Sequence, residues 1–249
     1  MNKKNLAPAV AIIAAAGSGT RMGGVSKPLM KLDGKPTFLY SVDLFIKSPY
    51  IEKICISAKK EDIPLLREIV ARENYPKEVI VAEGGKTRQE SVKRAFSAAF
   101  SGKAKTKFVA IHDAARPLLT PDELKKAFET AEKYGNAVCA ARAKDTFKRT
   151  DKNAVVKEHV ERDELWHIQT PQIFDTDMFH TALALAEKNG TEFTDESGLV
   201  ADAGFIVKLV ECGHDNIKLT YPEDVFIAEA ILAKRKFVEK RKTERGDTI

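Results

Sequence analysis

Cysteine, tryptophan and long hydrophobic runs are scarce in this sequence of 249 residues. The longest apolar run near the N-terminus, residues 7–16, is too short to span a bilayer and does not show the arrangement of basic flank and cleavage site of an export signal. The three cysteines, Cys55, Cys139 and Cys212, lie far apart in apolar stretches, which is typical of buried free thiols rather than disulfides or a metal cluster. We therefore expect a cytoplasmic protein with no membrane segment and no zinc site.

Net charge is also small once the C-terminal tail is set apart. The formal charge is +5, and residues 234–249 hold seven basic and three acidic side chains. The rest of the chain is therefore nearly neutral, so its overall basicity does not predict nucleic-acid binding. We interpret the tail as the solvated end of a helix, with contact to an acidic partner as the alternative.

Apolar runs typical of buried strands alternate with segments of helical periodicity along the whole chain. This alternation predicts an α/β fold with a mostly parallel sheet, formed as one domain over residues 1–249. Strands are expected at 10–16, 51–57, 79–82, 108–112, 136–143 and 206–211. Helices are expected at 38–45, 65–69, 90–99, 178–188 and 195–203, from 121, and from about 222. The clearest helix start is Thr120-Pro121-Asp122-Glu123, which predicts a capping box.

Residues 144–162 break this alternation. They are densely charged, have no helical stripe, and carry the turn-prone sequence Asp151-Lys152-Asn153 in the middle. The pattern predicts an exposed hairpin.

A glycine-rich segment, Gly17 to Met22, follows the first expected strand. Small residues at a strand end let backbone N–H groups approach phosphate oxygens closely. Met22 stands where a dinucleotide fingerprint has its third glycine, and the Lys-Ser/Thr pair of a P-loop is missing. Two cations, Arg21 and Lys27, lie where a triphosphate would bind, which favours phosphoryl transfer over a plain turn with solvated charges.

Several separate blocks in this sequence, taken in order, resemble one enzyme family. They are Ala14 to Met22; Gly84-Gly85 with Arg88, Ser91 and Val92; His112 to Pro117; Asp145-Thr146 with Lys148-Arg149; Arg162 with Leu165-Trp166; Gln169 to Gln172 with Phe174; Thr194 to Glu196; and Asn216 to Lys218 with Pro222 to Asp224. The family is that of the 2-C-methyl-D-erythritol 4-phosphate cytidylyltransferases of the non-mevalonate isoprenoid pathway. The resemblance implies a Rossmann-like sheet flanked by helices, of the nucleotide-diphospho-sugar transferase type. It also implies transfer of CMP from CTP to the polyol phosphate, with release of pyrophosphate.

The resemblance also implies a role for particular side chains. Arg21 and Lys27 would stabilise the transition state at the α-phosphate, and Lys218 would hold the triphosphate and the acceptor phosphate together. Gly85, Arg88 and Ser91 are similar to the loop that recognises cytosine. The implied CTP site comprises Ala14, Ala15, Ala16, Gly17, Ser18, Gly19, Gly85, Arg88, Ser91, Asp113, Ala114 and Lys218.

The acceptor side of the implied site extends into a second subunit. The resemblance makes residues 144–162 an arm that joins a homodimer, so that Thr146 and Arg162 reach the acceptor phosphate in the neighbouring site, with Arg162 counted among the catalytic residues. Asp113 and Arg116 complete the acceptor set, although Arg116 is interpreted mainly as a residue that pins its loop. Asp113 would also help to position Mg²⁺ or another divalent cation, which prefers oxygen ligands.

Two features qualify this interpretation. His112 and His167 are expected to be structural, because an acceptor phosphate is already ionised at neutral pH and needs no general base. After Lys27 the family usually has Gln and an aromatic residue where this chain has Pro28-Leu29, so the loop there is expected to follow a different path.

Three other functions remain open at this point. A ribitol 5-phosphate (pentitol-phosphate) cytidylyltransferase would share the CTP half of the site. A non-catalytic nucleotide-binding protein with the same fold is a second alternative. It would have no need to keep Arg21, Lys27, Asp113, Arg162 and Lys218 together. A nicotinamide dehydrogenase is disfavoured by the missing third glycine.

Overall fold

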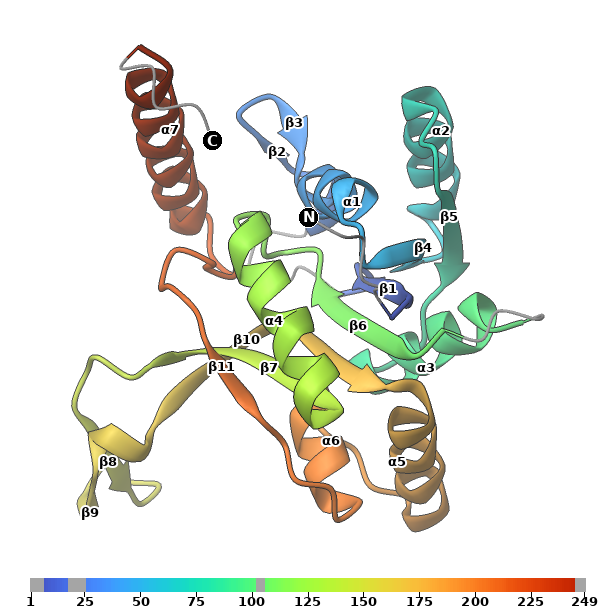
Figure 1. The fold of residues 1–249 in the computed structure, drawn as a ribbon. Coiled ribbons are helices and arrows are strands. Elements are labelled where there is room, and N and C mark those ends of the chain that lie inside the picture. The colour runs from blue at the N-terminus through green and yellow to red at the C-terminus, as the bar shows by residue number, and fades with distance from the viewer. Residues whose placement is uncertain (1–6, 18–25, 102–105, 245–249) are drawn as a thin grey trace.

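A computed structural model describes residues 7–17, 26–101 and 106–244. Its centre is a seven-stranded sheet in the order β11-β7-β10-β6-β1-β4-β5 (Figure 1). β10 runs antiparallel to both of its neighbours, and the other adjacent strands are parallel, so the predicted mostly parallel α/β fold is confirmed. The strands span Ala9–Ala14 (β1), Ile51–Ala58 (β4), Glu78–Glu83 (β5), Phe108–Asp113 (β6), Asn136–Arg142 (β7), Trp166–Asp175 (β10) and Leu209–Glu211 (β11).

Helices cover both faces of this sheet. They are α1 (Thr37–Lys47), α2 (Ile63–Glu73), α3 (Arg88–Ala99), α4 (Pro121–Tyr134), α5 (Thr176–Asn189), α6 (Glu196–Asp202) and α7 (Glu223–Glu244). Alternate residues of β1 enter two separate cores, because successive strand side chains point to opposite faces. Ile13 belongs to a core that includes side chains of α1, α2 and α4, whereas Ile12 belongs to a second core that includes side chains of α3, α5 and α6. β1 is therefore buried on both faces, as a central parallel strand should be.

Helix α4 begins and ends where its sequence predicts. Thr120 Oγ1 accepts a hydrogen bond from Glu123 N at 3.2 Å, and Thr120 N donates to Glu123 Oε2 at 3.0 Å, which is the expected capping box. The helix ends at Gly135, whose φ of 78° lies in the left-handed region that favours glycine.

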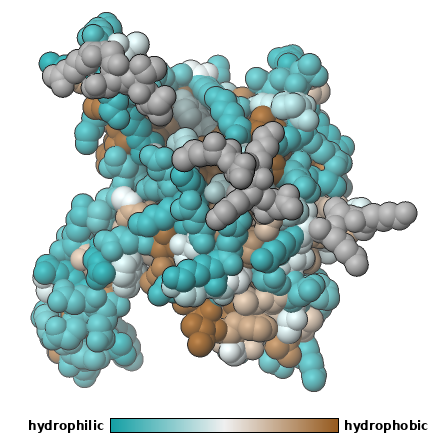
Figure 2. Space-filling view, in the orientation of Figure 1, coloured by the Kyte–Doolittle hydropathy of each residue, from teal (hydrophilic) through white to brown (hydrophobic). Residues whose placement is uncertain are grey.

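The segment predicted to be a hairpin is one. β8 (Phe147–Thr150) and β9 (Val156–Val160) pair antiparallel and project from the sheet (Figure 1). The Asp151 carboxylate closes the turn by accepting from Asn153 N and Val155 N. All of β8 is exposed, and the hairpin's surface is mostly hydrophilic (Figure 2).

The sequence did not predict β10, which lies between β6 and β7. Its middle holds Gln169-Thr170-Pro171-Gln172, a polar run interrupted by a proline that cannot donate to a strand ladder. The pairing of β10 with β7 is irregular between Ile168 and Gln172, so the proline falls where the ladder is already broken. Thr170 and Gln172 are buried there through hydrogen bonds, which apolar periodicity does not detect. A short hairpin of β2 (Lys31–Leu32) and β3 (Lys35–Pro36) was also missed.

None of the helices in the described ranges is both long and apolar enough to cross a membrane.

Candidate active site

A cavity of about 410 Å³ lies across the carboxyl ends of β1, β4, β5 and β6. Ligands bind at this edge in open α/β sheets, because the loops that follow parallel strands meet there. The residues that line it are Ala14, Ala15, Ala16, Gly17, Lys27, Pro28, Lys59, Gly85, Lys86, Thr87, Arg88, Ser91, Asp113, Ala114, Ala115 and Lys218. The cavity thus gathers all of the CTP-site candidates that lie within the described residues. Ser18, Gly19 and Arg21 lie outside the described residues.

Backbone hydrogen bonds hold the small residues after β1 in place. Ala15 N donates to Ser57 O at 2.8 Å, and Ala114 N donates to Ala14 O at 3.0 Å. Gly84 lies so close to this segment that a Cβ added to it would be 2.5 Å from Ala16 Cβ. A glycine is therefore required for the β5 loop to approach the end of β1.

Lys27 reaches the cavity from a short helical turn. It begins a 3-10 helix, Lys27–Leu29, in which Pro28 occupies the first turn, a position where the proline ring is tolerated. Its Nζ donates to the carbonyl oxygen of Leu219 at 3.0 Å. Pro28 and Leu29 therefore continue the turn that Lys27 begins, and Lys27 and Pro28 both line the cavity.

The loop after β5 is organised by two hydroxyl groups. Thr87 Oγ1 caps α3 by accepting from Glu90 N. Ser91 Oγ accepts from Gly85 N at 2.9 Å and donates to Thr87 O at 2.7 Å, so this hydroxyl shapes the loop. Lys86 N donates to Glu90 Oε2 at 2.7 Å, so the backbone groups of Gly85 and Lys86 are both held on the cavity wall.

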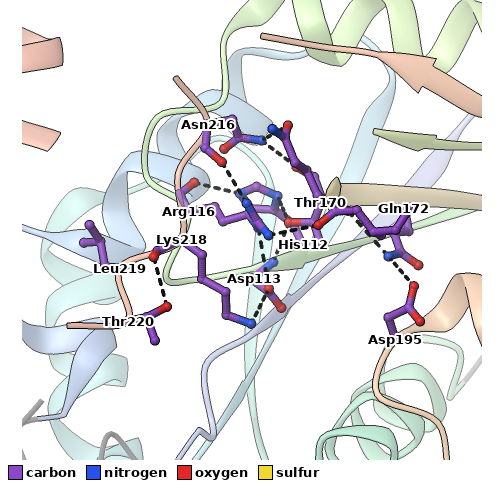
Figure 3. Close-up of polar contacts among 12 residues, drawn as sticks. His112, Asp113, Arg116, Thr170, Gln172, Asp195, Asn216, Lys218, Leu219 and Thr220 are labelled. Atoms are coloured by element: carbon purple, nitrogen blue, oxygen red, sulfur yellow. Dashed lines mark hydrogen bonds and ion pairs between the residues drawn. The ribbon is translucent and has the colours of Figure 1, made fainter. Parts of the chain in front are cut away.

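Asp113 is the centre of the site's charge. Its Oδ2 is 2.9 Å from Lys218 Nζ and 3.7 Å from Arg116 Nε, and its Oδ1 accepts from Arg88 Nη2 at 3.1 Å. Figure 3 shows Lys218 and Arg116 converging on this carboxylate. Burial alone would raise the pKa of Asp113, but Arg88, Lys218 and Arg116 outweigh that effect and hold the pKa well below 3.8. Asp113 is therefore ionised throughout the neutral range.

The segment that carries Lys218 is fixed by its neighbour Leu219. The Leu219 side chain is fully buried with Leu32 and Leu118, and its N–H donates to Ala115 O at 2.8 Å. These contacts bring Lys218 beside a strand that ends more than a hundred residues earlier in the chain.

Arg116 is bound mainly by backbone oxygens. Its Nη1 donates to Asn216 O at 2.8 Å (Figure 3) and its Nη2 to Ile168 O at 3.2 Å, and the side chain does not line the cavity. This agrees with its interpretation as the residue that pins the loop after β6.

His112 does not line the cavity. It is fully buried, its ring nitrogens contact Thr170 Oγ1 at 2.8 Å and Arg116 O at 3.1 Å, and its ring packs edge-on against Phe45. Burial lowers the pKa of His112 to about 4, so the ring is neutral at pH 7. His167 lies beside Phe147 at the base of the hairpin and does not line the cavity either.

The structure does not bring Thr146 and Arg162 into the cavity of their own chain. Both are exposed at the base of the hairpin, and Arg162 Nη1 donates to Lys144 O at 3.3 Å. Sequence reasoning also missed Lys59 and Lys86, which line the cavity, and it named Glu196 only within the block Thr194 to Glu196, without a role. Lys59 and Lys86 follow β4 and β5, so the rule that ligands bind at strand ends could have found them, whereas Glu196 is placed only by tertiary packing.

Comparison with known proteins agrees with this geometry. A family model described as IspD, 2-C-methyl-D-erythritol 4-phosphate cytidylyltransferase, matches residues 9–234. Relatives of that name from Lysinibacillus sphaericus and Symbiobacterium thermophilum are 37% and 38% identical over 225 and 226 residues; each alignment covers 90% of this chain, and 95% and 93% of the relatives. The chain belongs to the 2-C-methyl-D-erythritol 4-phosphate cytidylyltransferase family.

Solved structures of the family have the same fold. The 4-diphosphocytidyl-2C-methyl-D-erythritol synthase of Anaerococcus prevotii superposes with a TM-score of 0.79 at 27% identity, covering 91% of this chain and 99% of its own. The 2-C-methyl-D-erythritol 4-phosphate cytidylyltransferase of Thermus thermophilus gives 0.71 at 26% identity, covering 89% and 98%. The resemblance inferred from the sequence is therefore confirmed, as is the nucleotidyltransferase class that it implied.

Proposed function

We propose that this chain transfers CMP from CTP to 2-C-methyl-D-erythritol 4-phosphate, giving 4-diphosphocytidyl-2-C-methyl-D-erythritol and pyrophosphate. An oxygen of the acceptor phosphate forms the new bond to the α-phosphorus, and the bond from that phosphorus to the β-phosphate oxygen breaks. No proton has to be removed, because the attacking phosphate is already ionised. What remains for the protein is to bring two anions together in line and to neutralise their charge.

The presence of Lys27 and Lys218 together in the lining of the cavity is the observation that carries this proposal. Lys27 is fixed through the Leu219 carbonyl, and Lys218 through Asp113, so the two ammonium groups come from neighbouring points of the structure. Fixed cations in a partly enclosed site stabilise charge that develops on phosphate oxygens. Arg21, from the segment before Lys27, is proposed as the third cation.

The cytosine end of CTP is proposed to lie against the loop of Gly85 to Ser91. Ser91 holds the Gly85 backbone, and Gly84 lets the loop approach Ala16. Backbone N–H and C=O groups held in this way can read the edge of a base, and a closely packed wall favours a pyrimidine over a purine.

Asp113 fits a divalent cation. It is an ionised carboxylate on the cavity wall, and a metal ion would share its two oxygens with Arg88 on Oδ1 and Lys218 on Oδ2. One protein carboxylate together with substrate phosphates is a usual environment for Mg²⁺. When bound there, Mg²⁺ would supply further neutralisation of phosphate charge.

The acceptor site is proposed to be completed by a second subunit. The hairpin projects from the body, and a two-stranded hairpin alone is marginally stable in water, so a partner surface would explain its retention. Thr146 and Arg162 would then contact the acceptor phosphate in the partner's cavity, where a guanidinium can bind two phosphate oxygens at once.

Turnover with defined substrates tests the proposal. We expect pyrophosphate release from CTP with 2-C-methyl-D-erythritol 4-phosphate in the presence of Mg²⁺, and much less with ribitol 5-phosphate or with ATP. Faster turnover with ribitol 5-phosphate would show that this compound is the acceptor substrate. Binding of CTP without turnover would favour a non-catalytic protein.

A further inference from the structure

Arg88 lies between two buried carboxylates. Its Nη1 donates to Glu196 Oε1 at 2.6 Å, while its Nε and Nη2 donate to Asp113 Oδ1 at 3.3 and 3.1 Å. Glu196 is 3% exposed and Asp113 is 7% exposed. The guanidinium therefore links α6 to the end of β6, and it does so on the wall of the cavity.

Glu196 is itself held in one position. It is the first residue of α6, and the preceding residue, Asp195, caps that helix by accepting from Ser197 N and Gly198 N. Asp195 also accepts from Gln172 Nε2 at 3.0 Å, which ties the start of α6 to β10. The Glu196 carboxylate thus offers Arg88 a fixed anchor.

A contribution to the stability of the fold does not by itself explain the buried carboxylate of Glu196. Burial raises the pKa of Glu196, the Arg88 pairing offsets only part of that effect, and Glu196 Oε2 is buried with no hydrogen-bond partner among the described residues. A buried ion pair seldom stabilises a fold more than well-packed apolar side chains would. The arrangement is better explained by what Arg88 does when it is held.

We propose that Glu196 is a positioning residue for the transfer reaction, acting through Arg88 on Asp113. With Nη1 bound to Glu196, the other edge of the guanidinium faces Oδ1, so the Asp113 carboxylate is turned with Oδ2 towards Lys218. This inference rests on the proposed roles of Asp113 and Lys218.

Loss of the anchor would affect turnover more than binding. Arg88 would then be free to turn towards the triphosphate, and Asp113 would lose the contact that orients it. The Lys218 ammonium would be misplaced relative to the α-phosphate, and a misplacement of about 1 Å can cost on the order of 100-fold in rate. Lys27 and the Gly85 backbone, which Ser91 holds independently of Glu196, would be unchanged, so the KM for CTP should stay within about threefold.

Five variants test the inference: Glu196→Ala, Glu196→Gln, Arg88→Met and the two double variants. We expect kcat to fall about 100-fold in Glu196→Ala and about 10-fold in Glu196→Gln, whose amide oxygen can still accept from Arg88. In the Arg88→Met background neither change at Glu196 should reduce kcat further, because the residue through which Glu196 acts is gone. Glu187→Gln is the matched control. It removes an exposed ion pair between Glu187 of α5 and Lys93, which lies on α3 as Arg88 does, and it should leave kcat unchanged.

Each other outcome is decisive. Normal kcat in Glu196→Ala with an inactive Lys218→Met would overturn the inference and leave the proposed function standing, whereas full activity in Lys218→Met would remove the proposed site itself. Equal losses in the wild-type and Arg88→Met backgrounds would show that Glu196 does not act through Arg88. If Glu196→Ala fails to fold, the cycle made with Glu196→Gln, which preserves the side-chain shape, decides in the same way.

Discussion

Lys27 and Leu219 are joined by a hydrogen bond of 3.0 Å from Nζ to the carbonyl oxygen, although 192 positions separate them in the chain. This contact joins the segment that follows β1 to the segment that precedes α7. Lys218, the residue before Leu219, forms an ion pair with Asp113. The two lysines therefore form one unit, and their variants should behave alike.

Replacing either lysine should abolish most of the activity. We expect Lys27→Met and Lys218→Met each to lower kcat by about 100- to 1,000-fold, because each removes one fixed charge from the transition state. Pyrophosphate release under saturating substrates measures the loss. Lys125→Met, on the exposed surface of α4, should be as active as the wild type, and similar losses in all three variants would contradict a specific role.

Asp113 should make stability depend on pH in the acid range. Its pKa is lowered in the folded chain, so its stabilising effect is complete above the unfolded value of 3.8 and is lost as the pH falls through the folded pKa. Asp113→Asn should cost about 3 kcal/mol at pH 7, because it leaves Arg88 and Lys218 without their shared anion. Urea denaturation should show that the difference from wild type shrinks below about pH 4. A difference that stays constant down to pH 3 would contradict the lowered pKa.

Gly84→Ala should disturb both stability and nucleotide binding. The new Cβ would lie 2.5 Å from Ala16 Cβ, and such overpacking typically costs about 1–3 kcal/mol. Adding Ala16→Gly should restore part of the loss, because it removes the clashing carbon, although Ser57 and Ser91 remain close. Thermal denaturation of the single and double variants measures the rescue, and its absence would place the cause elsewhere.

A site shared between subunits should allow two inactive variants to restore each other. Lys27→Met and Arg162→Ala homodimers should both be inactive, but a mixed dimer contains one cavity that has Lys27 and receives Arg162 from the partner. After subunit exchange we expect about a quarter of wild-type activity, since about half of the dimers are mixed and each has one intact site. Lack of recovery, with exchange verified by mass spectrometry, would mean that the hairpin does not serve the neighbouring cavity.

Cys55 should resist alkylation in the folded protein. Its side chain is fully buried on β4, and burial raises the pKa of its thiol to about 12. Iodoacetamide at pH 8 should therefore modify Cys55 only after denaturation, as peptide mass spectrometry would show. Rapid labelling of the native protein would indicate that β4 opens locally.

Local signals predicted the elements that they control. Thr120 and Glu123 gave the start of α4, and the charged run around Asp151 gave the hairpin, because capping and turn chemistry depend only on neighbours in sequence. β10 was missed because Thr170 and Gln172 are stabilised in the sheet by partners that are distant in the chain.

The same distinction applies to the site. The glycine-rich segment after β1 predicted a binding site at this strand end, where the cavity lies, while Lys218 was identified only by family resemblance. The contact between Arg88 and Glu196 spans 108 positions, so nothing in the local sequence of either residue predicted it. The position of a side chain that depends on tertiary packing can be read only from the folded structure.

The position of Lys218 in the chain also bears on how the protein is made. Most of the cavity wall comes from residues before 116, but Lys218, one of the three cations beside Asp113, is synthesised about a hundred residues later. A nascent chain could therefore fold β1, β4, β5 and β6 on the ribosome while Asp113 still lacks Lys218. Catalytic competence should consequently arise late in translation, after most of the sheet has already formed.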